Sequence, residues 1–191
     1  MTQLEDGSSP LQLNVVVNDS HTKVVQTQAG ELMYTLRKSK KRHLGGALDC
    51  QLSDAQAKTS DETLLIKRGM LSKAVAFSTA SGARLVTLIH PAFDPGQHDF
   101  EWMSSSYRWQ TAAGSKRWMG KRLCIILTEM STEQLIAEIT GDAGYADKVD
   151  TKITIFGRQD DRMWMRILVA TALIAIKEER RNAKASPGYG P

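Results

Sequence analysis

The stretch of sequence that decides the fold lies near the end of the chain and reads Met163-Trp164-Met165-Arg166-Ile167-Leu168-Val169-Ala170-Thr171-Ala172-Leu173-Ile174-Ala175-Ile176. Two acidic residues, Asp160 and Asp161, precede it, and the charged run Lys177 to Arg181 follows it. Acidic side chains at the start of a helix and basic ones at its end interact favourably with the helix dipole. The pattern predicts an α-helix over residues 161–181.

This helix is apolar on every side, so it has to be surrounded by other apolar groups. A membrane does not suit it, because a spanning helix needs about 20 apolar residues. A central arginine such as Arg166 would also cost about 2.5 kcal/mol or more on insertion. We therefore expect no transmembrane segment, and a helix that is buried inside the protein.

The sequence before the helix alternates between apolar and polar residues with the period of two that is typical of half-buried strands. The alternation is clearest at Leu11 to Val17 and recurs at Lys73 to Ser78, Arg84 to His90, Leu123 to Leu127 and Val149 to Ile155. About ten to twelve short strands separated by turn residues indicate a sandwich or a barrel. The simplest surrounding for a central helix in such a chain is a curved or closed sheet.

Four aromatic residues, Phe100, Trp102, Tyr107 and Trp109, flank the three serines at 104–106. This arrangement predicts a β-hairpin with the serines in its turn and aromatic pairs across its strands. The aromatic side chains could also line a ligand pocket, but at alternating strand positions they more often belong to the core.

Several segments lack a clear strand pattern. Residues 37–61 are basic and then polar, and we expect there a long surface loop with at most one short strand at Leu48 to Leu52. Residues 131–140 suit either a helix with a capping box or a strand. The polar residues 1–10 and the small, polar residues 183–191 are predicted to be disordered.

The composition is that of an ordinary globular protein. The chain has 191 residues, of which 41% are hydrophobic and 24% are charged, and its formal net charge is +4 at pH 7. This length suits one domain with its own core. The two cysteines, Cys50 and Cys124, lack the spacing of a disulfide framework, and the first residues lack the pattern of a signal peptide. These features indicate a reducing compartment.

Three segments of the chain resemble members of one superfamily. They are Asn18-Asp19-Ser20 through Gly30-Glu31-Leu32-Met33-Tyr34, the hairpin Phe100-Glu101-Trp102 to Tyr107-Arg108-Trp109, and Ile167-Leu168-Val169-Ala170-Thr171-Ala172-Leu173 with the charged run Lys177-Glu178-Glu179-Arg180-Arg181. In their order and spacing they are similar to the Tubby C-terminal-like superfamily, which includes the phospholipid scramblases and the plant LURP-one-related proteins. The similarity is greatest to a poorly characterised fungal branch.

The resemblance covers residues 11–182, which we expect to form a single domain. It implies a mainly β fold, namely a Tubby-like closed β-barrel around a buried hydrophobic C-terminal α-helix. It also implies phosphoinositide or lipid binding as in Tubby proteins, lipid movement as in scramblases, or a defence role as in the plant proteins. A shared fold does not choose among these functions, so candidate site residues have to come from the sequence itself.

Clusters of basic residues are the candidate binding sites. The first cluster is Arg37, Lys38, Lys40, Lys41 and Arg42, the second is Lys116, Arg117, Lys121 and Arg122 around Trp118, and a thinner group is Arg180, Arg181 and Lys184. Near a membrane each basic side chain contributes about 1 kcal/mol toward anionic lipids, and tryptophan suits the headgroup level. The clusters would also suit nucleic acid or nuclear import, and the alternative without function is a set of solvated loops.

No catalytic, metal or cofactor site is recognisable. Cys124 lies in an apolar strand, where cysteine behaves as a small hydrophobic residue, and Asp49 beside Cys50 disfavours a thiolate. Possible metal ligands are His90, Asp94, His98 and Asp99. Their spacing matches no known metal site. We therefore expect a protein that is not an enzyme and that has no cofactor.

The sequence favours a binding module that docks on anionic lipid headgroups, such as phosphoinositides, through the second basic cluster. One alternative is a protein-interaction or defence-type adaptor in which residues 37–61 contact a protein partner. Another is an enzyme with an unrecognised site, and nucleic acid is a less favoured partner. The expected location is the cytoplasm, including the membrane periphery, or the nucleus.

Overall fold

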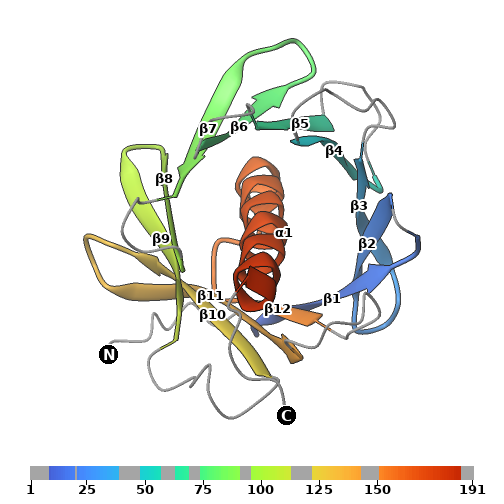
Figure 1. Cartoon of the computed structure of the whole chain (residues 1–191). Coiled ribbons are helices and arrows are strands. Elements are labelled where there is room, and N and C mark those ends of the chain that lie inside the picture. Colours follow the sequence, from blue (N-terminus) through green and yellow to red (C-terminus); the bar gives the residue numbers. More distant parts are fainter. Residues whose placement is uncertain are drawn as a thin grey trace.

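The computed structural model describes residues 9–19, 21–38, 48–56, 63–68, 74–90, 96–112, 122–142 and 151–185. Its elements are β1 (Leu11–Val17), β2 (Thr22–Thr27), β3 (Leu32–Lys38), β4 (Leu48–Asp54), β5 (Thr63–Arg68), β6 (Ala74–Thr79), β7 (Arg84–Ile89), β8 (Gln97–Trp102), β9 (Ser105–Thr111), β10 (Arg122–Glu129), β11 (Gln134–Asp142), β12 (Thr151–Ile155) and α1 (Arg162–Ala185). Each strand pairs antiparallel with its neighbours in sequence, and β12 pairs with β1, so the strands close into a barrel. Figure 1 shows α1 in the middle of this ring. The predicted closed barrel around a buried C-terminal helix is confirmed.

The alternating pattern of each strand gives the barrel wall an apolar inner face. In β1, Leu13 and Val15 are buried while the residues between and beside them are partly exposed. The register continues this inner face across the junctions, because Leu13 lies opposite Ile153 of β12 and Val15 lies opposite Val25 of β2. Since side chains alternate between the faces of a strand, a slip of one residue would expose the whole inward set.

The helix fills the space inside the wall. Every residue from Trp164 to Ile176 is buried. The indole Nε1 of Trp109 on β9 donates a hydrogen bond to Thr171 Oγ1 on the helix at 3.1 Å, and the rings of Tyr107 and Trp164 lie 4.8 Å apart. Aromatic contacts and a buried hydrogen bond therefore join the wall to the helix. Within the described part of the chain, no helix combines the length and the apolar character needed to cross a bilayer.

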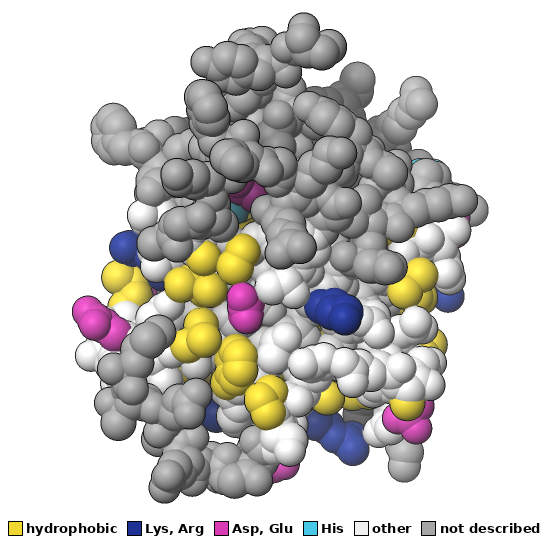
Figure 2. All heavy atoms as spheres, turned by 90° about the horizontal axis from the view of Figure 1, so that it is seen from below, with side chains coloured by type: hydrophobic (Ala, Val, Ile, Leu, Met, Phe, Trp, Pro, Cys, Tyr) yellow, Lys and Arg dark blue, Asp and Glu magenta, His cyan; other side chains and the backbone are white. Residues whose placement is uncertain are grey.

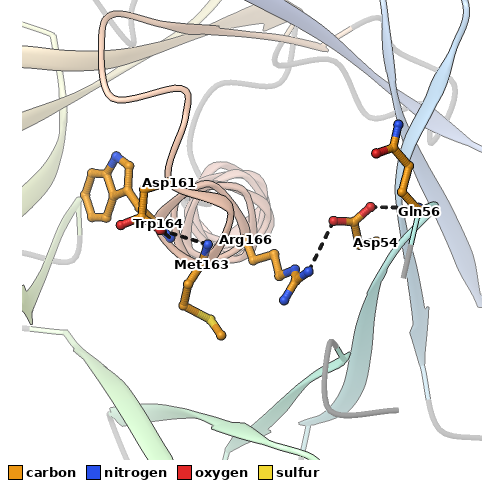
Figure 3. A network of polar contacts seen from close by, with 6 residues as sticks. All are labelled: Asp54, Gln56, Asp161, Met163, Trp164 and Arg166. Carbon is orange, nitrogen blue, oxygen red and sulfur yellow. Dashed lines mark hydrogen bonds and ion pairs between the residues drawn. The ribbon is translucent and has the colours of Figure 1, made fainter. Parts of the chain in front are cut away.

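Polar contacts fix the beginning of α1 (Figure 3). The Asp161 carboxylate accepts hydrogen bonds from the backbone N–H groups of Met163 and Trp164 at 2.9 and 3.0 Å, as a helix N-cap does. One turn later, the buried Arg166 points toward the wall and forms an ion pair with Asp54 at the end of β4, with an N–O distance of 3.3 Å. The predicted acidic start of the helix therefore acts as a cap, and the arginine within the apolar run has an acidic partner in the wall.

Within residues 37–61, the short strand allowed at Leu48 to Leu52 exists as β4 and continues to Asp54, and the predicted loop needs correction at its start. Arg37 and Lys38 are the last residues of β3, and β4 pairs with both β3 and β5. The strand pattern of β4 is weak in the sequence, because polar residues surround the buried Cys50 and Leu52. The helix is also longer than predicted, since it continues to Ala185 and so includes residues 183–185 of the expected tail.

The aromatic hairpin exists, but its turn is displaced from the predicted one. The turn residues are Met103 and Ser104, with φ angles of 47° and 66°, and two positive φ angles are the mark of a tight two-residue hairpin turn. Phe100 consequently lies opposite Tyr107, and Trp109 lies opposite His98 rather than opposite another aromatic residue. The alternation predicted which side chains face inward but not which of them are opposite one another.

The remaining ambiguous segment is a strand. Residues 134–142 form β11, which pairs with β10 and β12, and residues 131–133 form the preceding turn. The predicted disorder at residues 1–8 and 186–191 falls outside the described residues.

Candidate functional site

The two ends of the barrel differ in which connections they carry. We call the end where α1 finishes the exit rim and the opposite end the entry rim. The connections after the odd-numbered strands β1 to β11 lie at the exit rim, and the others lie at the entry rim. Contacts at the end of the helix establish this direction. Arg68, the last residue of β5, forms an ion pair with Glu178 at 2.7 Å, and Arg180 donates a hydrogen bond to Thr151, the first residue of β12, at 3.0 Å.

Charge is distributed unequally between the two rims. In the sequence, the exit-rim connections contain eight Lys or Arg residues against four Asp or Glu residues, a balance of +4. The entry-rim connections contain two Lys or Arg residues against six Asp or Glu residues, a balance of −4. The end of α1 adds basic residues, among them Arg180 and Arg181, at the exit rim. The small net charge of the whole chain therefore conceals a basic end and an acidic end.

Basic side chains from three elements act on one another at the exit rim. Burial lowers the pKa of Lys177, the nearby Cys50 and Glu178 oppose this shift, and the positive charges of Lys38 and Arg68 add to it. Lys38 ends β3, Arg68 ends β5 and Lys177 belongs to α1. The described part of the rim therefore already brings positive charges together, and Glu178 lies among them.

The predicted basic clusters can be placed only in part. Arg37 and Lys38 lie at the end of β3, whereas Lys40, Lys41 and Arg42 fall outside the described residues. Of the second cluster, Arg122 is the first residue of β10, and Lys116, Arg117, Trp118 and Lys121 fall outside the described residues. Because β3 ends and β10 begins at the exit rim, both clusters join the barrel at the same rim.

The barrel wall has a different surface from the exit rim. Figure 2 shows the molecule from below the view of Figure 1, the side on which β1, β10, β11 and β12 lie. On the described residues of this face, Lys and Arg side chains stand apart from one another, and hydrophobic side chains gather beside them. No basic patch is visible on this described part of the wall.

Two histidines meet inside the barrel where β7 and β8 join. His90 Nδ1 and His98 Nδ1 are 2.6 Å apart, with the two rings edge to face. His98 is almost fully buried, and burial followed by the charge of His90 lowers its pKa to about 4. Burial followed by the charge of Arg68 also lowers the pKa of His90. Near neutral pH both rings are therefore uncharged, and one Nδ1 donates a hydrogen bond to the other.

This pair partly matches the predicted group of metal ligands, but the group does not assemble. The carboxylate of Asp99 accepts two hydrogen bonds from the Arg108 guanidinium, both at 2.8 Å, and Asp94 falls outside the described residues. Among the residues that the structure describes, no three His, Cys, Asp or Glu side chains gather as metal ligands. The spacing of His90 and His98 around a Pro- and Gly-containing turn was the only sequence signal for their meeting.

We expect acid to destabilise the fold through this pair. His98 has a folded pKa of about 4 against about 6.5 in the unfolded chain, so the unfolded state binds more protons between these values. The free energy of unfolding is therefore unaffected by titration of His98 above pH 6.5, and it decreases as the pH falls toward 4, by about 3 kcal/mol at most. Urea unfolding over this pH range measures the loss. His98→Gln should reduce the dependence on pH, and the exposed His21→Gln should not; equal slopes in both variants would contradict the assignment.

The surroundings of Cys124 do not activate its thiol. Cys50 is buried. Burial raises the pKa of Cys124, and its thiol donates a hydrogen bond to Glu138 at 3.4 Å, which raises the pKa further. A catalytic cysteine needs a lowered pKa, so the Cys124 thiol is not activated as a nucleophile.

A hollow that no sequence pattern predicted lies in the wall between β7 and β8. It has a volume of about 430 Å³ and is open to solvent. Its lining mixes apolar side chains such as Leu85 and Ile89 with polar ones such as Thr87 and Glu101. Its lining includes the buried Val86 and Phe100 as well as outward-facing residues, so the hollow lies between the two strands.

Known proteins resemble this chain in fold only. No protein-family model matches the chain, and no curated protein sequence matches it. Among solved structures, it resembles the X-ray structure of a protein from Arabidopsis thaliana, AT5G01750, with a TM-score of 0.54 and 12% sequence identity. The match covers 87% of this chain and 88% of that chain. At this level of identity, the likeness extends to the whole barrel and leaves function open.

Proposed function

We propose that this chain is a non-enzymatic binding module of the Tubby C-terminal-like superfamily, in its fungal branch, and that its exit rim docks on anionic lipid headgroups such as phosphoinositides. The docking residues are Lys116, Arg117, Trp118, Lys121 and Arg122, with the first basic cluster beside them. The protein would then work in the cytoplasm at the periphery of a membrane.

The observation that carries the proposal is the charge difference between the two rims. A surface that docks on a membrane has to present its basic groups to one side, because screening limits their reach to about 10 Å at moderate salt. The strand order supports a common rim for both basic clusters, because β3 ends and β10 begins at the rim where Lys177 and Arg180 lie. An acidic entry rim would favour the same orientation, since anionic lipids repel it.

The filled interior favours surface binding over catalysis inside the barrel. Ile167, Leu168, Leu173 and Ile174 occupy the centre and are almost completely buried. A substrate would have to displace these side chains, which close packing makes costly. In the adaptor hypothesis, residues 37–61 would contact a protein partner on either side of β4, which takes up residues 48–54 of that segment.

Sedimentation with phosphatidylcholine vesicles, with and without phosphatidylinositol bisphosphate, tests the proposal. We expect the purified chain to bind the anionic vesicles at low salt and to be released at high salt. Replacing two basic residues in Lys116→Gln/Arg117→Gln should weaken binding by roughly 30-fold, at about 1 kcal/mol for each charge.

A matched control removes the same charge from the other rim. Lys58 lies in the connection between β4 and β5, and Arg162 is the exposed first residue of α1, so both belong to the entry rim. Lys58→Gln/Arg162→Gln should bind vesicles like the unmodified chain. If the folded protein binds no anionic vesicle, or if both double variants lose binding equally, the basic exit rim is not a lipid-docking surface.

A further inference from the structure

The barrel wall opens between β7 and β8. Every other pair of neighbouring strands shares five or more register positions, whereas within the described residues β7 and β8 share one, Ile89 with Asp99. From this position the β6–β7 and β8–β9 hairpins lean apart (Figure 1). Residues 84–88 of β7 and 100–102 of β8 therefore have no strand partner on the edge that faces the opening. On their other edges they pair with β6 and β9.

The hollow of about 430 Å³ occupies this opening, and its size is in the range of about 300–1,000 Å³ that ligand pockets have. It is lined by residues 84–87 of β7 and by residues 99–101 of β8. Consecutive residues of a strand point to opposite faces. A hollow that touches consecutive residues therefore faces the edge of the strand, where the backbone N–H and C=O groups are.

The lining adds side-chain chemistry to these two edges. Ile89 and Met130 are 53% and 43% exposed, although large hydrophobic side chains are rarely so exposed in the described residues. On the β8 side, Asp99 is engaged by Arg108. Glu101 is exposed, and no described residue forms an ion pair with its carboxylate. The lining also includes the exposed Arg84 of β7, so the hollow combines unpaired backbone, apolar contacts and an exposed charge of each sign.

We propose that this opening is a binding site for an extended peptide segment of a partner protein, which adds to the barrel as a strand. Unpaired strand edges accept extended peptides through backbone hydrogen bonds, and alternate side chains of the peptide supply specificity. The occupant has alternating apolar residues that contact Ile89 and Met130. It also has a basic residue that pairs with Glu101 and an acidic residue that pairs with Arg84. A segment of about five to seven residues spans residues 84–88 at about 3.3 Å per residue.

Charge favours this occupant over a lipid surface. The connections at the wide end of the opening, residues 80–83 and 103–104, carry no charge. The lining itself has Asp99 and Glu101 against Arg84, so a peptide with charges of both signs fits there and an anionic membrane is not attracted. The site is separate from the basic exit rim. Its test therefore does not depend on lipid docking, and one molecule can use both surfaces together.

The experiment starts from a random seven-residue peptide library displayed on phage and selected on the full chain. Soluble Ser106→Tyr protein is present in excess as a competitor, because Ser106 lines the hollow on the outer face of β9 and a tyrosine there fills it. We expect enriched peptides to alternate apolar and polar residues and to contain a lysine or arginine. A synthetic copy of the enriched peptide is then measured by fluorescence anisotropy.

Two substitutions in the protein and one chemical change in the peptide separate the contribution of charge from that of backbone hydrogen bonds. Glu101→Lys should weaken peptide binding about tenfold through the lost charge pair, whereas Glu31→Lys, the same charge change at the exposed β2–β3 turn, should not. Backbone nitrogens of an extended peptide form two alternating sets, of which one faces the strand edge. Methylation of that set should reduce binding by about tenfold or more, because it removes hydrogen bonds to the strand edge. Thermal unfolding establishes that each protein variant is folded.

Several outcomes would overturn the proposal. Selection that enriches no peptide would do so. So would Ser106→Tyr and Glu101→Lys variants that bind the peptide as tightly as the unmodified chain does, or peptide binding that is unchanged by methylation of either set of alternate backbone nitrogens. Size-exclusion chromatography with light scattering covers the remaining occupant. A dimer that forms in the unmodified chain and is lost in Ser106→Tyr would assign the opening to a second copy of this chain.

Discussion

Replacing Leu168 with alanine is expected to lower the free energy of unfolding by about 3–5 kcal/mol, the upper part of the range for buried leucines. Leu168 is fully buried in the middle of α1, and the removed atoms leave a cavity. The cost of such a cavity depends on how far the surroundings can collapse into it. Here the surroundings are a barrel wall of paired strands, open only between β7 and β8 within the described residues, which cannot move inward without disturbing its hydrogen bonds.

Urea unfolding measures this effect, with Leu32→Ala as the matched control. Leu32 lies in β3 and is 47% exposed, so the same substitution there should cost less than about 1 kcal/mol. A loss at Leu168 as small as the loss at Leu32 would show that the helix is loosely held. That result would revive the hypothesis of an enzyme with a substrate cavity inside the barrel.

The central helix and the barrel class could be predicted because each depends on a local pattern. An apolar run with an arginine and charged ends specifies a buried helix, and strict alternation specifies strands with one buried face. The exact partner of each strand residue could not be predicted in the same way. In the aromatic hairpin the turn at Met103 and Ser104 uses positive φ angles that neither residue usually adopts, so the sequence pointed to the serines instead.

The candidate site depended on counting strands correctly. In a barrel of sequential antiparallel strands, two connections share a rim only if an even number of strands lies between them. Six strands, β4 to β9, separate the two basic clusters. Without β4, whose residues are mostly polar, the count would be five, and the clusters would be placed at opposite rims. The clusters themselves were visible in the sequence, but their common rim was not.

The opening between β7 and β8 had no sequence signal. In both strands, buried and exposed residues alternate as regularly as in the other strands. Val86 and Leu88 are buried in β7, and His98 and Phe100 are buried in β8. What distinguishes them is that their backbones diverge after Ile89. Side-chain patterns report which face of a strand is buried, and they carry no information about whether its edge has a partner.

The buried ion pair between Arg166 and Asp54 should be the most sensitive polar contact of the core. Only 6% of the Arg166 side chain and 13% of the Asp54 side chain are exposed. Asp54→Ala removes this carboxylate from beside the buried guanidinium. Breaking a buried pair in this way costs about 3–5 kcal/mol, because the remaining charge is poorly compensated.

Removing both charges should cost much less than removing one. In Asp54→Asn/Arg166→Met, the asparagine can still accept the hydrogen bond that Asp54 receives from the backbone of Gln56 at 2.8 Å, and methionine replaces the arginine stem with an apolar chain. Replacing a buried ion pair by groups of similar volume is often neutral or stabilising. We therefore expect urea unfolding to show a double variant more stable than Asp54→Ala by about 2 kcal/mol or more.

The stability of the double variant, compared with that of Asp54→Ala and of the unmodified chain, also tests why an arginine interrupts the apolar run. If the double variant is as stable as the unmodified chain and still folds to one state, Arg166 contributes little net stability, and the pairing with β4 instead selects the orientation of α1 in the barrel. A double variant that is less stable than Asp54→Ala would mean that Arg166 is held mainly by contacts other than Asp54. In that case the ion pair would not be what fixes the entry end of the helix.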